Sequence, residues 1–277
     1  MRAYPALEIR GADPNRLLAA IDDLSATAIE EREDAVRVFF STTAARDQAQ
    51  SALAPHFDVA PIDVSDEDWA RRSQENLKPI TVGRITVFPN PEPRIPNPGI
   101  ADPEPLIPNP VSIVIVPSMG FGTGHHATTR LCLAALQTLD LADAFVLDVG
   151  TGSGVLAIAA ERLGAARALG IDHDPDAVQS AQENLGFNPA AGRVTFAMDD
   201  LKTATLPLAD VVTANLTGAL LVVSADALLG AVRSGGTLIV SGLLSHERDD
   251  VVRALGGVAV VWEGEEDGWV GLAVKKP

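Results

Sequence analysis

The sequence has very little cysteine and no long apolar run, and both scarcities exclude classes of protein. Its single cysteine, Cys132, excludes an intramolecular disulfide and any zinc or redox site built on paired cysteines, which fits a reducing cytoplasm. No uninterrupted apolar segment approaches the roughly 18 residues of a membrane span, and residues 1–15 lack the apolar core of a signal peptide. We therefore expect a cytoplasmic protein.

Basic side chains are outnumbered by acidic ones. The chain has 21 Lys and Arg against 37 Asp and Glu, so its formal net charge is -16, and such a surface repels nucleic-acid backbones and anionic membranes. The three tryptophans, Trp69, Trp262 and Trp269, are too scattered to form a platform for stacked bases. We expect neither a direct nucleic-acid partner nor a membrane partner, whereas a basic protein would be attracted to this surface.

Proline and glycine are distributed unevenly, and their distribution divides the chain. Of the 19 prolines, 11 lie between Pro79 and Pro117, whereas 20 of the 23 glycines follow Met119. The tripeptide Pro-Asn-Pro occurs three times in the proline-rich stretch, which forbids a helix and favours extended chain. We predict a small α+β N-terminal domain, then a helix with a proline-rich linker, then a larger catalytic domain, over residues 1–64, 65–110 and 111–277.

The first segment contains short apolar strands and helical patterns but no chemical motif. The order strand, helix, strand, strand, helix, with a last strand near Val59, is typical of a ferredoxin-like sandwich. The strands are expected at 4–9, 26–30 and 35–40, the helices at 14–24 and 43–54, and a further capped helix at 65–76. We interpret this segment as a recognition or packing module.

In the third segment, strands and helices alternate regularly. Such alternation predicts an α/β fold with a doubly wound, mostly parallel, Rossmann-like sheet and helices on both of its faces. The strands are expected at 111–116, 145–149, 168–171, 194–197, 211–214 and 237–241, and the helices at 126–139, 155–163, 176–184 and 218–232. Two further strands, 258–262 and 269–274, flank Glu-Glu-Asp-Gly and predict a hairpin, so the last strand should run antiparallel.

The strongest local signal is the segment VLDVGTGSGVL, in which a strand runs into three glycines and then a helix. Gly150, Gly152 and Gly154 let a ligand approach the backbone beside a helix N-terminus, at the carboxyl end of a strand in an α/β sheet. Asp172 ends the next strand, where its carboxylate can accept hydrogen bonds from ribose hydroxyls. These residues predict a site for a nucleotide-type cofactor.

Two cofactors compete for this loop. The segment from Gly152 to Ala157 satisfies the dinucleotide fingerprint, and an acidic residue about 20 positions further on is also what NAD sites use. Asp148, two residues before the glycines, would lie close to a pyrophosphate, whereas it could accept a hydrogen bond from the ammonium group of S-adenosylmethionine. The residues therefore favour S-adenosylmethionine over NAD.

Two strand ends are expected to face the same crevice. Asn215 follows the strand at 211–214, where its side-chain amide would lie near the methyl group of the cofactor. Asp199 follows the strand at 194–197, either as a contact for an adenine amine or as a solvated turn residue.

A second glycine-rich turn, residues 120–129, carries hydroxyls and imidazoles around a helix start. Thr123 and the threonines that follow it are explained equally well as helix caps and as ligand contacts. His125 and His126 are adjacent and have no metal-ligand spacing, so we expect no metal site, although one of the rings could lie over the substrate.

These motifs resemble a known family. VLDVGTGSGVLAIAA with Asp172 looks like the class I S-adenosylmethionine-dependent methyltransferases, and FGTGHHATTRLCLAAL is similar to the FGTGTHPTT motif of the PrmA family, the bacterial methyltransferases of ribosomal protein L11. The similarity extends over most of the chain, including the strand end at 214–216 and the C-terminal hairpin. The sequence departs from the family pattern at His125, at Ala127 and in a longer proline-rich insertion, all near the implied substrate entrance.

The resemblance implies an enzyme that takes S-adenosylmethionine and methylates lysine side-chain and N-terminal amines of ribosomal protein L11, which its N-terminal module would dock. The candidate catalytic residues are Asn215, Thr123 and His125. The candidate cofactor-binding residues are Thr123, Asp148, Gly150, Thr151, Gly152, Gly154, Asp172, Asp199 and Asn215. The alternatives are a class I methyltransferase for another protein or a small molecule, and an NAD-dependent oxidoreductase, for which no proton donor can be located.

Overall fold

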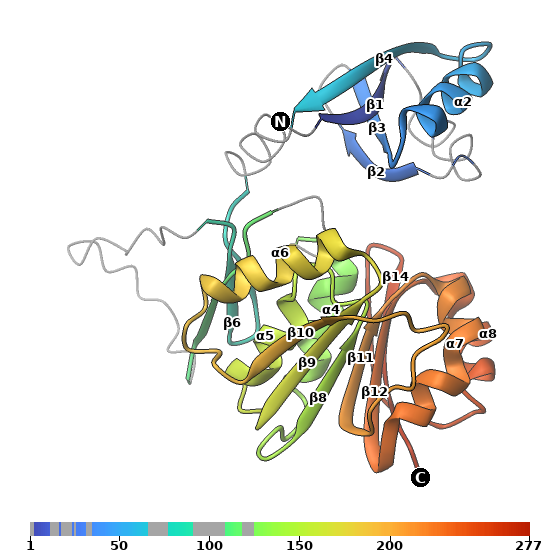
Figure 1. The fold of residues 1–277 in the computed structure, drawn as a ribbon. Helices are drawn as coiled ribbons and strands as arrows, with labels where there is room; N and C mark the ends of the chain where they lie inside the picture. The colour runs from blue at the N-terminus through green and yellow to red at the C-terminus, as the bar shows by residue number, and fades with distance from the viewer. Residues whose placement is uncertain are drawn as a thin grey trace. The chain divides into compact units, whose positions relative to one another are not determined.

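The fold is that of a computed structural model. The residues that it describes are 3–11, 17, 24, 26–31, 35–65, 77–90, 109–117 and 125–277. The chain divides into two compact units, residues 1–75 and 76–277, each of which is described by itself (Figure 1). Among the described residues, no helix is both long enough and apolar enough to cross a membrane.

The N-terminal unit is an antiparallel sheet with a helix packed on it. The strands are β1 (Ala3–Arg10), β2 (Ala26–Glu31), β3 (Ala35–Phe40) and β4 (Asp58–Ser65), in the order β2-β3-β1-β4, and the helix is α2 (Thr43–Leu53). Leu7, Val38, Phe40 and Leu53 are buried in one cluster between the sheet and the helix. Most of the helix expected at 14–24, and the part of the helix expected at 65–76 that follows β4, lie outside the described residues.

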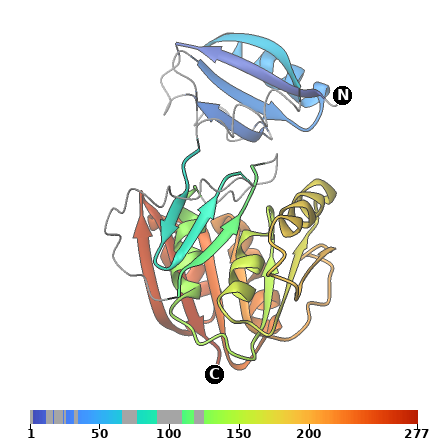
Figure 2. The same ribbon diagram turned by 90° about the vertical axis from the view of Figure 1, so that its left-hand side faces the viewer.

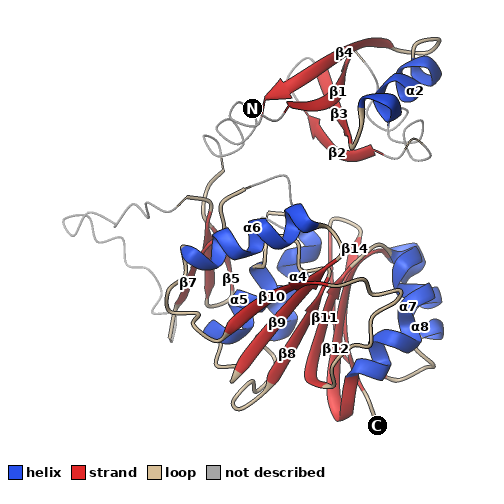
Figure 3. Cartoon of the chain, viewed as in Figure 1, coloured by secondary structure: helices blue, strands red, loops and turns tan. Residues whose placement is uncertain are grey.

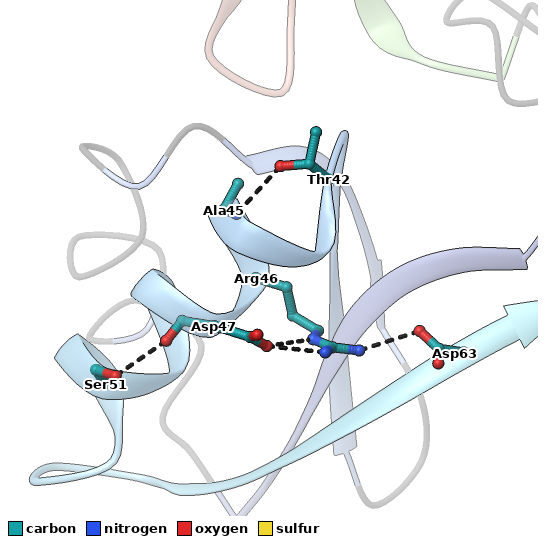
Figure 4. Close-up of polar contacts among 6 residues, drawn as sticks. All are labelled: Thr42, Ala45, Arg46, Asp47, Ser51 and Asp63. Atoms are coloured by element: carbon teal, nitrogen blue, oxygen red, sulfur yellow. Dashed lines mark hydrogen bonds and ion pairs between the residues drawn. The ribbon is translucent and has the colours of Figure 1, made fainter.

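Polar contacts hold α2 on this sheet (Figure 4). Thr42 caps the helix, because its hydroxyl accepts a 3.1 Å hydrogen bond from the backbone N–H of Ala45. Arg46 donates to the carboxylate of Asp47 at 2.8 Å and to that of Asp63, on β4, at 3.0 Å. Both carboxylates are exposed, so these ion pairs contribute little free energy, at most about 1 kcal/mol each. Asp47 lies on α2 itself, so only the pair of Arg46 with Asp63 joins the helix to β4.

The C-terminal unit contains a seven-stranded mixed sheet in the order β10-β9-β8-β11-β12-β14-β13 (Figure 3). The strands are β8 (Phe145–Val149), β9 (Arg167–Asp172), β10 (Val194–Met198), β11 (Ala209–Asn215), β12 (Val232–Leu244), β13 (Ala259–Glu266) and β14 (Trp269–Lys275). Strands β8 to β12 pair in parallel, and β14 is antiparallel to both of its neighbours. The hairpin and the antiparallel last strand are therefore present as expected.

Helices cover both faces of this sheet (Figure 1). One face carries α7 (Gly218–Ala231) and α8 (Arg248–Ala254), and the other carries α4 (Ala127–Leu136), α5 (Val155–Arg162) and α6 (Pro175–Gly186). Successive residues of β8 alternate between the two cores, so that Leu147 packs with α7 whereas Val146 packs with α5. Both faces of the strand are buried, and the polar side chain of Asp148 within it is therefore exceptional.

A three-stranded sheet that the sequence patterns did not predict belongs to the same unit. Strands β5 (Ile80–Val82), β6 (Ile85–Phe88) and β7 (Val111–Val114) lie side by side in the order β5-β6-β7 (Figure 2). Ile85, Val87 and Ile113 are fully buried in the core that α4 and α5 share.

This sheet changes the expected organisation in two ways. Strands β5 and β6 lie within 65–110, the range taken as helix and linker, yet they pack in the second unit. The strand expected at 111–116 as part of the main sheet is β7, which instead pairs in parallel with β6. The physical reason is that Pro79 and Pro89 flank these strands rather than interrupt them, so every residue of β5 and β6 keeps its backbone N–H for pairing.

Candidate functional site

Three neighbouring strands bring the predicted residues to one end of the sheet. Gly150 follows β8 directly, Asp172 ends β9 and Asn215 ends β11. Strand β8 lies between β9 and β11 in the sheet. Strands β8 and β9 lead into α5 and α6 on one face, whereas β11 leads into α7 on the other. This point, where the winding of the sheet changes direction, is where open α/β sheets bind ligands.

The loop after β8 depends on glycine. Gly150, Gly152 and Gly154 have φ angles of 71°, 52° and 83°, in the left-handed region that other residues rarely adopt. A Cβ on Gly154 would lie 2.7 Å from the ring of Phe196, so the loop also packs too closely for a side chain there. The backbone N–H groups of Gly150 and Thr151 both donate to the carbonyl of Ile171 at 2.9 Å, which ties the loop to the end of β9.

Asp172 is nearly buried and organises this loop. One oxygen of its carboxylate accepts a hydrogen bond of 3.0 Å from the N–H of Gly152, and the other accepts one of 3.1 Å from the N–H of Asp174. An ionised carboxylate has about four acceptor positions. The group can therefore hold the loop and still accept hydrogen bonds from ligand hydroxyls.

Asp148 is buried, with 1% of its surface exposed, and it joins the loop to β11. Its two carboxylate oxygens accept hydrogen bonds from the hydroxyl of Thr151 at 2.7 Å and from that of Thr213 at 2.6 Å. Burial raises the pKa of Asp148 to about 6, and the charge of Asp172 adds to this, whereas the two hydroxyl donors oppose it. The sequence indicated Asp148 and Thr151 as site residues, but it did not indicate Thr213.

Asn215 meets the second glycine-rich turn at the start of α4. Its side-chain N–H₂ group donates to the hydroxyl of Thr129 at 3.3 Å. Thr128 and Thr129 are both 1% exposed, whereas Asn215 is half-buried. The fold thus brings together two motifs that are 86 residues apart in the sequence.

The two histidines before α4 have different surroundings. The Nε2 atom of His125 lies 2.9 Å from the carbonyl oxygen of Lys78, which ties it to the segment leading into β5. His126 caps α4 through Nδ1, and its ring meets that of Trp269 edge-on at 5.0 Å between centroids. Burial, together with the charge of Arg130, lowers the pKa of His126.

Arg130 links α4 to the C-terminal hairpin. Its guanidinium forms an ion pair of 2.7 Å with Glu266, at the end of β13, and it also donates to the backbone carbonyl of His125. The hairpin therefore supports the same helix start from which Thr129 meets Asn215.

The remaining candidate residues lie at the edge of the site or beyond what can be described. Asp199 is exposed after the edge strand β10, where its backbone N–H donates to the carbonyl of Asp172 at 2.9 Å and its carboxylate accepts from the N–H of Asp200 at 3.0 Å. Thr123 lies outside the described residues. Within the described ranges, no group of three or more His, Cys, Asp and Glu side chains could hold a metal ion.

Thr213 is the polar partner that the sequence motifs did not indicate. Thr213 precedes Asn215 by two positions, so both side chains point to the same face of β11. A threonine two residues before Asn215, on a buried strand, was the signal that could have identified Thr213 as a site residue.

The chemistry of these side chains fits S-adenosylmethionine. Two carboxylates, Asp148 and Asp172, lie beside the glycine loop, and each accepts a hydrogen bond from it. Negative side chains suit a cofactor that carries an ammonium, a sulfonium and ribose hydroxyls better than one that carries a pyrophosphate.

Comparison with known proteins gives consistent matches over most of the chain. The model of the family described as ribosomal protein L11 methyltransferase (PrmA) matches residues 13–277. The ribosomal protein L11 methyltransferase of Geobacter sulfurreducens is 40% identical over 273 residues, which cover 90% of this chain and 85% of the relative. That of Deinococcus radiodurans is 36% identical over 232 residues, which cover 81% of this chain and 78% of the relative.

A solved structure is similar as well. The crystal structure of a ribosomal protein L11 methylase from Lactobacillus delbrueckii subsp. bulgaricus matches with a TM-score of 0.62 and 25% sequence identity. The match covers 73% of this chain and 100% of that one.

Proposed function

Because the chain belongs to the ribosomal protein L11 methyltransferase (PrmA) family, we propose that it transfers methyl groups from S-adenosylmethionine to amines of ribosomal protein L11. The observation that carries this proposal is the family match over residues 13–277, which includes the glycine loop, Asp172 and Asn215. The acceptors are lysine side-chain amines and the N-terminal amine. The acidic surface, with its net charge of -16, would steer a basic partner toward the enzyme.

The proposed cofactor contacts follow from the geometry of the loop. The carboxylate of Asp172 would accept hydrogen bonds from the ribose hydroxyls, and the backbone from Gly150 to Gly154 would lie against the methionine part of the ligand. Asp148 would contribute its negative charge and hold Thr151 in place. Asp199, at the edge of the site, and Thr123, from the sequence motif, complete the proposed set.

The proposed reaction needs alignment more than activation. S-adenosylmethionine supplies a methyl group on a sulfonium, which is already a good leaving group. The residues around Asn215 would hold a neutral amine in line with that methyl group. Such alignment can by itself lower the activation free energy by several kcal/mol. The side-chain oxygen of Asn215 is the proposed acceptor for a hydrogen bond from the amine, since its N–H₂ group is directed to Thr129.

The amine must lose a proton before it attacks. A lysine has an unperturbed pKa near 10.4, so desolvation in the site would help to neutralise it. Thr123 and His125 remain in the proposed catalytic set because they belong to the motif that ends at Thr128 and Thr129, beside Asn215. His125 would relay the proton.

The N-terminal unit is proposed to be a ferredoxin-like domain that recognises the protein substrate. The strand order β2-β3-β1-β4, with all pairs antiparallel, supports this topology. The proposed division is a recognition domain over 1–64, a connecting segment, and a catalytic domain that includes β5 and β6 and therefore begins before residue 111. A ribosomal substrate and a single cysteine both fit a cytoplasmic location.

The test measures cofactor binding and methyl transfer separately. S-adenosylmethionine and NAD are titrated into the purified protein by calorimetry, and ribosomal protein L11 is then incubated with the enzyme and labelled S-adenosylmethionine. Mass spectrometry should locate methyl groups on lysine or N-terminal amines, and Asn215→Ala should transfer methyl groups much more slowly than the wild-type protein.

Two other outcomes would support a different function. Cofactor binding without transfer to L11 would indicate a class I methyltransferase for another protein or a small molecule. Binding of NAD alone would favour an oxidoreductase and contradict the proposal.

A further inference from the structure

Leu216 connects the two halves of the site. It follows Asn215 at the end of β11 and lies two residues before the first turn of α7. Its backbone N–H donates to the carbonyl of Ser241, on β12, at 2.9 Å, and its side chain is half-buried at the edge of the core beneath α7. None of the motifs discussed above gives this side chain a role.

The side chain of Leu216 rests on the glycine loop. A Cβ placed on Gly150 would lie 2.5 Å from Cδ2 of Leu216 and 3.7 Å from its Cγ. The leucine methyl therefore occupies the space directly above the Cα of Gly150, at the first position of the loop that would bind the methyl donor. Gly150 has a φ of 71°, so this contact falls where the backbone turns away from β8.

The main chain of Leu216 is held from the opposite side. A Cβ placed on Gly242 would lie 2.1 Å from the carbonyl oxygen of Leu216 and 2.7 Å from its carbonyl carbon. The backbones of β12 and of this segment thus approach as closely as glycine permits. Because the obstacle is backbone rather than a flexible side chain, Leu216 cannot retreat toward β12.

The residues after Leu216 are held too. The carboxylate of Glu247 lies over Gly218, where an added Cβ would come within 2.6 Å of it, and it accepts a 2.8 Å hydrogen bond from the N–H of Leu244. A negative charge is favourable at the N-terminus of a helix, and Gly218 is the first residue of α7. The segment from Asn215 to Gly218 is therefore fixed at both of its ends.

We propose that Leu216 is a positioning residue, which sets the spacing between the methyl-donor loop at Gly150 and the acceptor-binding side chain of Asn215. Its main chain is packed against Gly242, and its side chain lies over the Cα of Gly150, so the size of this side chain sets where the loop lies once the pairing of Val149 with Ala214 ends. The inference rests on the proposed function, since it concerns the alignment of donor and acceptor. A misplacement of about 1 Å at a reacting centre can cost up to about 100-fold in rate.

The test compares Leu216→Ala with Leu216→Met and with Leu208→Ala. Leu208 is 56% exposed just before β11, so the same leucine-to-alanine change there should alter nothing. For Leu216→Ala we expect the Kd for S-adenosylmethionine, measured by calorimetry, to rise about 3- to 10-fold, and kcat for methylation of L11 to fall about 10-fold. Leu216→Met keeps a similar volume and should restore most of both values.

A double variant separates positioning from a loss of packing. Thr129→Val removes the hydroxyl that holds Asn215 and should lower kcat by itself. If Leu216→Ala displaces the loop and Thr129→Val displaces Asn215, both changes disturb the same alignment of donor and acceptor, and the double variant should be less impaired than the product of the two single losses. Multiplicative losses would overturn the proposal, because a general loss of packing would act independently of Thr129.

The calorimetric measurement decides the proposal even without activity. If the wild-type protein methylates nothing on L11, the proposed function fails, while the Kd for S-adenosylmethionine still tests the contact with Gly150. A folded Leu216→Ala variant with a Kd within about twofold of the wild-type value would overturn the positioning role.

Discussion

The hydroxyl of Thr213 donates a 2.6 Å hydrogen bond to Oδ1 of Asp148, and the two residues are paired in register across β11 and β8. The other oxygen of this carboxylate receives the hydroxyl of Thr151, in the glycine loop. Thr213 precedes Asn215 by two residues on the same face of the strand. One buried carboxylate therefore ties the loop to the strand that carries the proposed acceptor-binding residue.

The first prediction concerns the pH dependence that Asp148 contributes. Its pKa is raised from 3.8 to about 6, chiefly by burial, so the folded protein binds this proton more tightly than the unfolded chain does. The stability from this group is present below about pH 4 and is lost as pH rises to about 6. Asp148→Asn cannot ionise, so its stability relative to wild type should increase over this window, by about 2 to 3 kcal/mol.

Urea unfolding of both proteins at several pH values between about 4.5 and 7.5 measures this difference. A difference that stays constant over this range would show that Asp148 does not titrate in it. Asp140→Asn, the same substitution at an exposed position, serves as the control.

The second prediction concerns the cap of α4. Burial and the charge of Arg130 lower the pKa of His126 from 6.5. The unfolded chain binds this proton more tightly than the folded protein does. The stability from the neutral histidine is therefore present above the unfolded pKa of 6.5 and is lost as pH falls from there through the lowered folded pKa. Asparagine can accept the N–H of Thr128 as His126 does but does not titrate.

His126→Asn should therefore lose less stability than wild type when pH falls from about 7.5 to about 5. Thermal unfolding at these two values, compared with the exposed His56→Asn as a control, checks this. An equal loss in wild type and in His126→Asn would contradict the assignment of this acid sensitivity to the cap.

The third prediction distinguishes the two aspartates at neighbouring strand ends. Asp172→Ala removes a carboxylate that accepts two backbone N–H groups and is proposed to bind the ribose, so the Kd for S-adenosylmethionine should rise about 10-fold or more. Asp199 is exposed, and its carboxylate bonds only to the next residue among the contacts described, so Asp199→Ala should raise the Kd less than about threefold. Calorimetric titration of both variants measures this; equal effects would mean that the ribose is not bound at Asp172.

The fourth prediction uses two glycines in different settings. Gly242 has a φ of 90° and no room for a Cβ beside the carbonyl of Leu216, so Gly242→Ala should destabilise the protein by about 2 kcal/mol or more. Gly230 lies in α7 with nothing within 4 Å of an added Cβ, so Gly230→Ala should stabilise it by about 0.5 to 1 kcal/mol. Chemical unfolding gives both values, and a neutral Gly242→Ala would contradict the close approach on which the role of Leu216 depends.

Local patterns predicted much of the fold because they reflect properties of neighbouring residues. The glycine loop, the α/β alternation after residue 145 and the C-terminal hairpin follow from hydrophobic periodicity and turn residues, and each is present in the structure. Strands β5 and β6 were not found, because three- and four-residue strands are too short for a periodic signal and the nearby prolines favoured a linker.

The sequence by itself determined which residues to propose for the site. A strand that runs into alternating glycines, with an acidic residue at the end of the next strand, is typical of a cofactor site, so Gly150, Gly152 and Asp172 could be proposed without coordinates. Only the tertiary structure decided which groups they meet. Hydrogen bonds from Thr213 to Asp148 and from Asn215 to Thr129, and the leucine resting on Gly150, join residues 65 to 86 positions apart. Contacts of this kind depend on strand order and register, which no local pattern encodes.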